Sequence, residues 1–212
     1  MIAIGKKLKV INFLKKMNIK KYLFIFLIYS VSLNNSYSMG ADIFVQSTVN
    51  RASSILSEDI TRDQKIIELK KIAKETVDIK GIGFYTLGPI RKKLNDEQKQ
   101  KYIKLFEQYF LKSFSSRLAE YTNPEIDVYD KEVINENYTI VKSLLKGTNE
   151  RPEVKIDWRI YTKNTNNPLI RDLIIEGLSL ARTQKEEFSS ILNSNNGDIN
   201  LLFAALIKFS EN

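Results

Sequence analysis

The sequence contains no histidine and no cysteine. Without histidine the chain cannot form a Ser-His or Cys-His catalytic pair or a His-ligated metal site, although catalysis by carboxylates alone stays possible. Without cysteine it cannot form a disulfide or carry a lipid-modified cysteine. It also lacks a glycine-rich phosphate loop, an internal repeat and a low-complexity linker. We therefore expect no cofactor and no metal.

The N-terminal segment has the layout of a secretory signal peptide. Residues 1–21 carry seven lysines and no acidic residue, and residues 22–33 form an apolar run. Small residues follow, so we predict a signal peptide over 1–38 with cleavage after Ser38 or Gly40. The alternative is an uncleaved membrane anchor. It is disfavoured because the apolar run is shorter than the roughly 20 residues that span a bilayer.

Removing that segment changes the charge balance of the chain. The whole sequence has 33 Lys and Arg against 25 Asp and Glu, a net charge of +8. Without the seven lysines of residues 1–38, 26 basic residues face 25 acidic ones, a net charge of +1. Bulk charge therefore gives no support for nucleic-acid binding. Residues 39–212 are long enough for one domain with a sizeable core, and a cysteine-free exported domain fits a bacterial periplasm.

The order of the expected elements is helices, then strands, then helices. Period and capping signals predict helices at 42–57, 61–77, 95–121, 183–193 and 198–209, with a short helix or irregular segment at 79–88. Period-two features predict strands at 125–134, 136–146, 153–162 and 169–182. Short connections between consecutive strands favour an antiparallel meander. The predicted class is α+β, with a four-stranded antiparallel sheet.

Three segments present apolar faces that predict contact with the protein interior. In 153–162, alternation places Val154, Ile156 and Trp158 on one face, and in 136–146 it turns Val141 inward. On the long helix, aromatic residues recur every fourth position and include Phe110 and Phe114, followed by Leu118. These stripes are compatible with an ordinary core as well as with a ligand cavity.

The strand predicted at 169–182 is too apolar to be half exposed. Strict alternation groups Asp172 and Glu176 with Leu178, so we consider a bulge or a close backbone approach at Gly177 that would turn Leu178 inward. Asp172 and Glu176 could form a catalytic carboxylate pair, but a salt bridge at the sheet edge is the commoner arrangement.

Two long segments resemble the periplasmic phospholipid-binding MlaC family, also called the toluene-tolerance auxiliary-component family. They are VDIKGIGFYTLGPIRKKLNDEQKQKYIKLFEQYFLKSF at 77–114 and LIRDLIIEGLSLARTQKEEFSSIL at 169–192. The order and spacing of these segments carry the resemblance, which covers essentially all of residues 39–212. Pro89-Ile90-Arg91 stands where the family usually has an aromatic residue after Leu-Gly.

The resemblance implies a helical layer on a curved antiparallel four-stranded sheet, enclosing an apolar cavity for the two acyl chains of a phospholipid. It implies a carrier, not an enzyme, that works between an outer-membrane lipoprotein/porin complex and an inner-membrane ABC lipid transporter and maintains outer-membrane lipid asymmetry. We expect a monomer. The pocket positions that the resemblance carries over are Phe114, Val154, Ile156, Trp158 and Leu178, and periodicity adds Phe110, Leu118 and Val141.

Two other functions are compatible with the same residues. The chain could be another periplasmic binding protein, such as a lipoprotein chaperone or a module for small apolar ligands. It could also be an isomerase-like enzyme on a similar cone-shaped fold, with Asp172 or Glu176 as the base.

Overall fold

The computed structural model describes residues 40–149 and 151–211. The predicted signal peptide at 1–38 lies outside these described residues and stays a prediction, as does the boundary of the domain at 39–212. Within the described ranges, no helix combines the length and the hydropathy that crossing a membrane requires.

Within the described residues, four α-helices and one 3-10 helix precede the sheet. They are α3 (Ala41–Ser57), α4 (Arg62–Thr76), α5 (Ile79–Thr86), η2 (Gly88–Lys92) and α6 (Asp96–Leu118). Capping boxes fix two of the starts, because Thr61 and Asn95 each exchange hydrogen bonds with a glutamine three residues later. The segment at 79–88, predicted as short or irregular, divides into α5 and η2. Pro89 occupies an early position of η2, where its missing N–H costs nothing.

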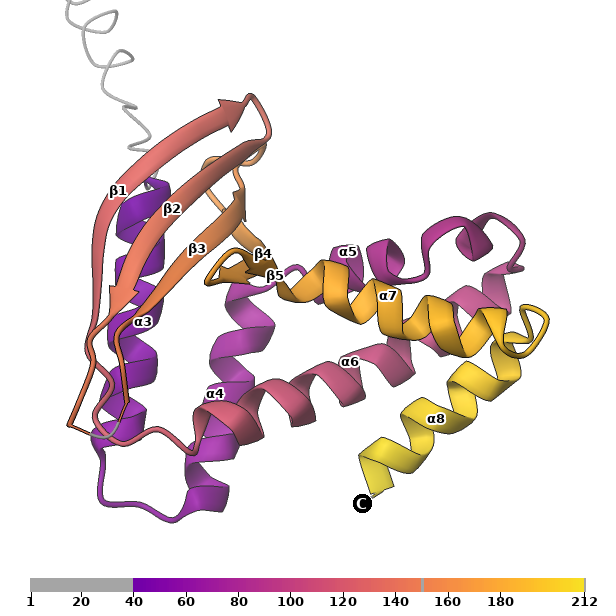
Figure 1. The fold of residues 1–212 in the computed structure, drawn as a ribbon, viewed down its shortest axis with the longest axis horizontal. Helices are drawn as coiled ribbons and strands as arrows, with labels where there is room; N and C mark the ends of the chain where they lie inside the picture. Colours follow the sequence, from indigo (N-terminus) through magenta and orange to yellow (C-terminus); the bar gives the residue numbers. More distant parts are fainter. Residues whose placement is uncertain (1–39, 150, 212) are drawn as a thin grey trace, which may run out of the picture. The chain divides into compact units, whose positions relative to one another are not determined.

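The five strands pair in sequence order and are antiparallel throughout (Figure 1). They are β1 (Ile126–Asn135), β2 (Tyr138–Leu145), β3 (Val154–Tyr161), β4 (Leu169–Ile175) and β5 (Leu178–Ser179). The predicted meander is therefore confirmed, with one correction. The region predicted as a single strand at 169–182 contains β4, a two-residue turn, the two-residue β5 and the start of a helix, so the sheet has five strands and not four.

The sheet contains a bulge, but not where the sequence suggested it. The register between β3 and β4 shifts between Arg159 and Ile160, which leaves Arg171 without a partner across the ladder. At Gly177, where a bulge was predicted, the chain reverses direction instead. Glu176 and Gly177 have φ angles of 49° and 83°, and Ile175 pairs with Leu178. Positive φ at both central residues is the geometry of a tight hairpin turn.

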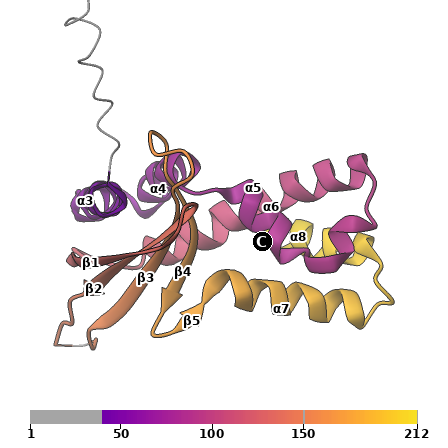
Figure 2. The ribbon, with the colours of Figure 1, turned by 90° about the horizontal axis from the view of Figure 1, so that it is seen from above.

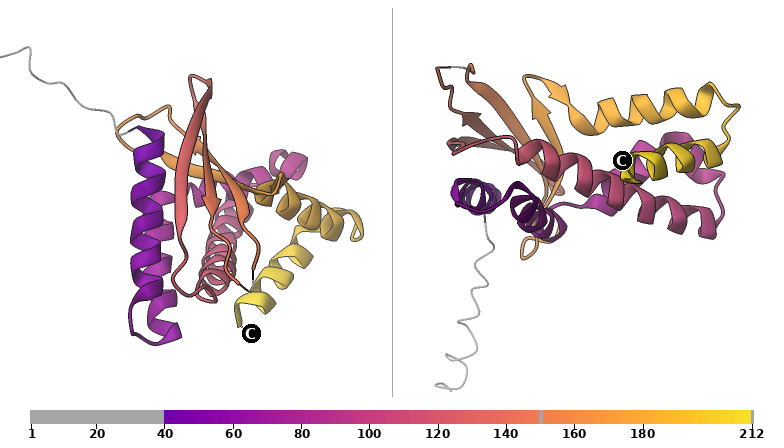
Figure 3. Two further views of the ribbon diagram at one scale, coloured as in Figure 1. Left: turned by 60° about the vertical axis from the view of Figure 1, so that its left-hand side comes forward. Right: turned by 90° about the horizontal axis from the view of Figure 1, so that it is seen from below.

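Two helices follow the sheet, α7 (Leu180–Asn193) and α8 (Ile199–Glu211). Figure 2 shows α3 and α4 on one side of the strands, and α3 contacts β1 and β2. Figure 3 shows α7 continuing directly from the last strand, and α8 contacts both α6 and α7. The helical layer on an antiparallel sheet is the α+β arrangement predicted from the sequence.

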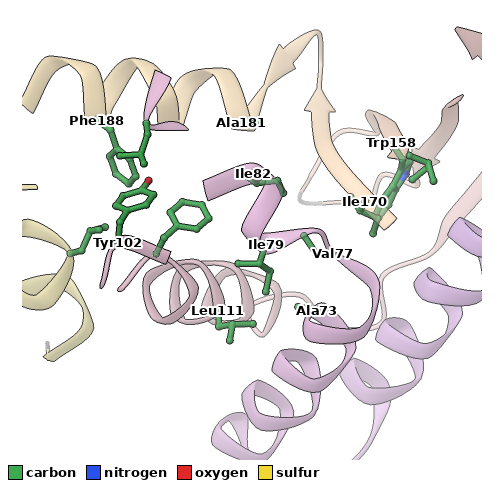
Figure 4. Close-up of a cluster of buried hydrophobic side chains, with 14 of the residues drawn as sticks. Ala73, Val77, Ile79, Ile82, Tyr102, Leu111, Trp158, Ile170, Ala181 and Phe188 are labelled. Carbon is green, nitrogen blue, oxygen red and sulfur yellow. The ribbon is translucent and has the colours of Figure 1, made fainter. Parts of the chain in front are cut away.

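The core is continuous from the sheet to the helices (Figure 4). At the helical end, the Tyr102 ring meets the Phe188 ring edge-on at a centroid separation of 6.5 Å. At the sheet end, Trp158 and Ile170 are buried. The indole Nε1 of Trp158 donates to Ser143 Oγ at 2.8 Å, which satisfies the ring's polar group inside the core. The space between these two ends holds the candidate site.

Candidate functional site

A cavity of about 320 Å³ lies between α6, α7 and the inner side of β3 and β4. Its floor is apolar and comes from five elements and the link between α4 and α5. The buried floor residues are Val77, Ile82, Phe106, Trp158, Ile170 and Ala181. Phe110, Phe114 and Leu173 are partly buried along its walls. A volume of this size is within the range of small-molecule binding sites.

The mouth of the cavity is polar, and its side chains are exposed or half-buried. Ser113 and Arg117 come from α6, and Thr183, Gln184 and Glu187 come from α7. Two exposed apolar side chains, Leu180 and Phe209, lie at the same opening. The lining therefore grades from apolar and buried to polar and exposed, which suits a ligand with an apolar body and a polar end.

A hydrogen-bond chain crosses the mouth from α6 to α7. The Tyr109 hydroxyl donates to Gln184 Oε1 at 2.7 Å, and Gln184 Nε2 donates to Glu187 Oε2 at 2.9 Å. Burial raises the pKa of Tyr109, and the negative charge of Glu187 adds to that effect. The Tyr109 ring also packs against Phe209 of α8, with centroids 4.7 Å apart. Tyr109 thus connects all three helices around the opening.

Asp172 lines the cavity and has a structural role there. Its side chain is buried, and its oxygens accept hydrogen bonds from the Ser179 hydroxyl at 2.6 Å and the Ala181 N–H at 3.0 Å. Ser179 in turn caps α7 through the Arg182 N–H. A carboxylate at a helix N-terminus is stabilised by the free N–H groups and the helix dipole. Asp172 therefore holds the start of α7 against the sheet.

Within the described residues, Asp172 and Glu176 form neither the catalytic carboxylate pair considered from the sequence nor the salt bridge expected at the sheet edge. Glu176 is exposed in the hairpin turn, where its carboxylate accepts a hydrogen bond from the Lys155 N–H. Neither carboxylate takes part in an ion pair within residues 40–149 and 151–211. The same ranges contain no group of acidic side chains that could hold a metal ion.

A second, wider hollow of about 720 Å³ lies between α5 and α7. Its walls are mostly polar side chains such as Arg182, Ser190 and Asn193, all exposed. Lys185 lies over the Tyr85 ring there, 5.1 Å from its centroid. This hollow is larger but is a solvated surface groove without an apolar floor, so the cavity between α6 and α7 is the better candidate.

Comparison with known proteins agrees with this architecture. The family model described as MlaC protein matches residues 46–208, about three quarters of the chain. The chain belongs to the MlaC family. The resemblance seen in the sequence is thus confirmed over α3 to α8.

A solved structure has the same MlaC fold. It is the phospholipid-binding protein from Ralstonia solanacearum, determined in complex with a phospholipid. The two proteins superpose with a TM-score of 0.69 at 20% sequence identity, over 81% of this chain and 97% of the other. At this identity the comparison establishes the shared fold.

Three of the eight residues predicted for the pocket line the cavity of this MlaC chain. They are Phe110 and Phe114 on α6 and Trp158 on β3. The two phenylalanine rings stack with centroids 5.5 Å apart. Their four-residue spacing places them on one face of the helix, which is the relationship the aromatic stripe predicted.

Four other predicted residues do not line the cavity, although three of them face the interior. Val141 and Ile156 are buried, and Val154 packs on the core. Val141 is on β2, which α3 contacts, so that part of the sheet packs against a helix and not against open space. Leu118 is partly buried in the last turn of α6. Alternation gave the correct face for the strand residues but not the part of that face that borders the cavity.

Leu178 is the clearest correction. It is 70% exposed, does not line the cavity and lies directly after the Glu176-Gly177 turn. The predicted inward orientation assumed a bulged but continuous strand, whereas the hairpin reverses the chain before Leu178. A two-residue turn ending in glycine between apolar runs was the available signal. The mouth residues Tyr109, Gln184 and Glu187 were missed because the contact between α6 and α7 is not local in sequence.

Proposed function

We propose that this protein binds a phospholipid, with the acyl chains against the apolar floor and the head group at the polar mouth. The observation that carries the proposal is the gradation of the cavity lining, from the buried Phe106 and Trp158 to the exposed Arg117 and Glu187. Membership of the MlaC family and the fold shared with the Ralstonia phospholipid-binding protein support it. Phe110, Phe114 and Trp158 are the predicted pocket residues that we propose to contact the chains.

The energetics of a lipid in water explain why such a protein needs no catalytic group. Two acyl chains hold about thirty methylenes, and exposing them to water costs on the order of 20 kcal/mol at about 0.8 kcal/mol each. A cavity that shelters the chains removes most of that cost. A bilayer offers similar shelter, so transfer between the two is near balance and partners must set its direction.

Lipid entry requires access to the apolar floor, which lies beneath the mouth between α6 and α7. We propose that α6 and α7 move apart when the lipid enters, since the cavity lies between them and the Tyr109–Gln184 hydrogen bond is the polar contact that crosses its mouth.

The cellular role that we propose is transport across the periplasm. The predicted signal peptide would export the chain, and the absence of cysteine fits that compartment. The carrier would exchange lipid with an outer-membrane lipoprotein/porin complex and an inner-membrane ABC transporter, and so maintain the asymmetry of the outer membrane.

Native mass spectrometry of the protein purified from a bacterial host tests the binding proposal. We expect a mass increment equal to one diacyl phospholipid, and the same lipid in a solvent extract of the protein. An unliganded mass under gentle ionisation, together with a lipid-free extract, would contradict lipid binding.

A further inference from the structure

The cavity lining contains few charged side chains, and they are of both signs. Arg117 is the only cation among the described residues that line the cavity, and Asp172 and Glu187 are the anions. Asp172 is buried, and its oxygens are already bonded to Ser179 and Ala181. A ligand at the mouth therefore meets one positive group on α6 and one negative group on α7.

Glu187 is held at the opening by its neighbours. Gln184 donates to one carboxylate oxygen of Glu187 and accepts from Tyr109, so the chain of hydrogen bonds fixes the carboxylate beside the mouth. Glu187 is otherwise exposed and retains free acceptor positions. It can accept hydrogen bonds from a cationic group without losing the bond to Gln184.

Arg117 faces the same opening from the last turn of α6. Among the residues that the structure describes, no carboxylate lies within ion-pair distance of its guanidinium. A free guanidinium offers a planar set of donors that matches a phosphate group. The phosphate that every phospholipid carries is thus the natural partner of Arg117.

We infer that the mouth selects phospholipids whose head group carries a primary ammonium as well as the phosphate, the ethanolamine type, over anionic lipids of the glycerol type. This inference rests on the proposed lipid binding. The phosphate pairs with Arg117, and the ammonium donates to Glu187. A glycerol head group satisfies Arg117 equally well, but it leaves its net negative charge beside Glu187. Because both side chains are exposed, the selectivity is modest, about threefold.

The test uses delipidated protein and vesicles of equal parts phosphatidylethanolamine and phosphatidylglycerol. After incubation the vesicles are removed, and the protein-bound lipid is extracted and quantified by mass spectrometry. We expect the bound ethanolamine lipid to exceed the glycerol lipid by about threefold. The excess should disappear at about 1 M salt, where exposed charges are screened within a few ångströms.

Three variants separate the roles of the charges. Glu187→Gln should bring the bound ratio close to one. Arg117→Gln should lower the amount of both lipids by a similar factor, because both carry the phosphate. Glu186→Gln is the matched control, since Glu186 is the neighbouring exposed carboxylate and does not line the cavity. It should retain the wild-type ratio.

The outcomes distinguish this inference from the proposed function. Bound lipid with no excess of the ethanolamine type, or an excess that Glu187→Gln leaves unchanged, would overturn the inference and leave lipid binding intact. Protein that takes up no lipid from the vesicles would overturn the proposed function, and the inference with it.

Discussion

The guanidinium of Arg171 pairs with the carboxylate of Asp78, where the bulge of β4 meets the start of α5. Asp78 also caps α5 by accepting from the Gly81 N–H at 2.8 Å, and its own N–H donates to the Ile170 carbonyl at 2.9 Å. Arg171 in turn lies over the Tyr161 ring, 4.5 Å from its centroid. One ion pair thus joins the helical layer to the sheet beside the cavity floor.

We predict that Asp78→Asn lowers the free energy of unfolding by about 2 kcal/mol, between the values typical of exposed and of buried pairs. The side chains of Arg171 and Asp78 are only 29% and 17% exposed, so the arginine left behind is incompletely solvated. Asparagine retains the helix cap, so the change isolates the charge. Urea denaturation monitored by circular dichroism measures the difference.

The control for this prediction is Glu68→Gln, which breaks the exposed pair with Lys71 on α4. An exposed pair of this kind is worth about 0.5 kcal/mol or less. If the two variants lose equal stability, the pair between Arg171 and Asp78 has no special role in joining the layers.

Tyr102 gives the fold a sensitivity to alkaline pH. Its ring is fully buried, its hydroxyl bonds to Thr86 Oγ1 at 2.8 Å, and burial raises its pKa far above the ordinary value. The unfolded chain loses this proton near pH 10, whereas the folded chain retains it. The stabilisation is therefore complete below about pH 10. It is lost above that value, at about 1.4 kcal/mol per pH unit.

Tyr102→Phe removes this titration. At neutral pH we expect it to be about 1 kcal/mol less stable than wild type, because Thr86 loses a hydrogen-bond partner. Above pH 10 the stability difference should shrink, since only the wild type pays the additional titration cost. Thermal melts of both proteins between pH 7 and 11 measure this, and parallel stability curves across that range would contradict it.

Phe114 lines the cavity, so a charged substitution at this position tests lipid binding directly. We predict that Phe114→Glu lowers co-purified lipid by about tenfold or more, because a carboxylate beside the acyl chains loses its hydration. Phe114 is half-buried on the cavity wall, so circular dichroism must show that the variant is folded. The measurement is lipid quantified in a solvent extract.

Leu178→Glu is the matched control for that experiment. Leu178 is 70% exposed after the hairpin turn, so the substitution should leave the lipid content unchanged. The free energy of unfolding should stay within about 0.5 kcal/mol of wild type. Loss of lipid in a folded Leu178→Glu protein would instead return Leu178 to the binding site.

The hydrogen bond between Tyr109 and Gln184 should slow lipid exchange. We predict that Gln184→Leu increases the rate of lipid transfer between vesicles by about fivefold, as expected when a bond of about 1 kcal/mol no longer closes the mouth. Transfer of a fluorescent phospholipid measures the rate. Gln108→Leu is the control, because it changes an exposed glutamine on α6, next to Tyr109, that does not line the cavity. It should leave the rate unchanged.

Local signals explain why most of the fold could be predicted from the sequence. The capping boxes at Thr61 and Asn95 involve residues three positions apart, so the starts of α4 and α6 were visible without tertiary information. Alternation in β3 likewise assigned Trp158 to the inner face, where it is buried. These elements depend on neighbouring residues and not on what covers them.

The cavity depends on relationships that no local pattern contains. An inward-facing residue meets either a helix or the cavity, depending on how the helices lie over the sheet. Val141 and Trp158 pair across β2 and β3, yet only Trp158 lines the cavity. The orientation of Leu178 depends on the backbone at Gly177. A bulge there would turn Leu178 inward, whereas the hairpin turn leaves it exposed.

The hydrogen bonds of Asp172 couple the stability of the last hairpin to that of α7. Its carboxylate bonds both to Ser179 of β5 and to the first turn of α7, so the end of the sheet and the start of the helix are stabilised by the same group. We therefore expect closure of the hairpin to stabilise the N-terminus of α7. A defect in the turn at Gly177 would be transmitted to one wall of the cavity while β1 to β3 stay paired, so that the protein could lose its ligand before it loses its fold.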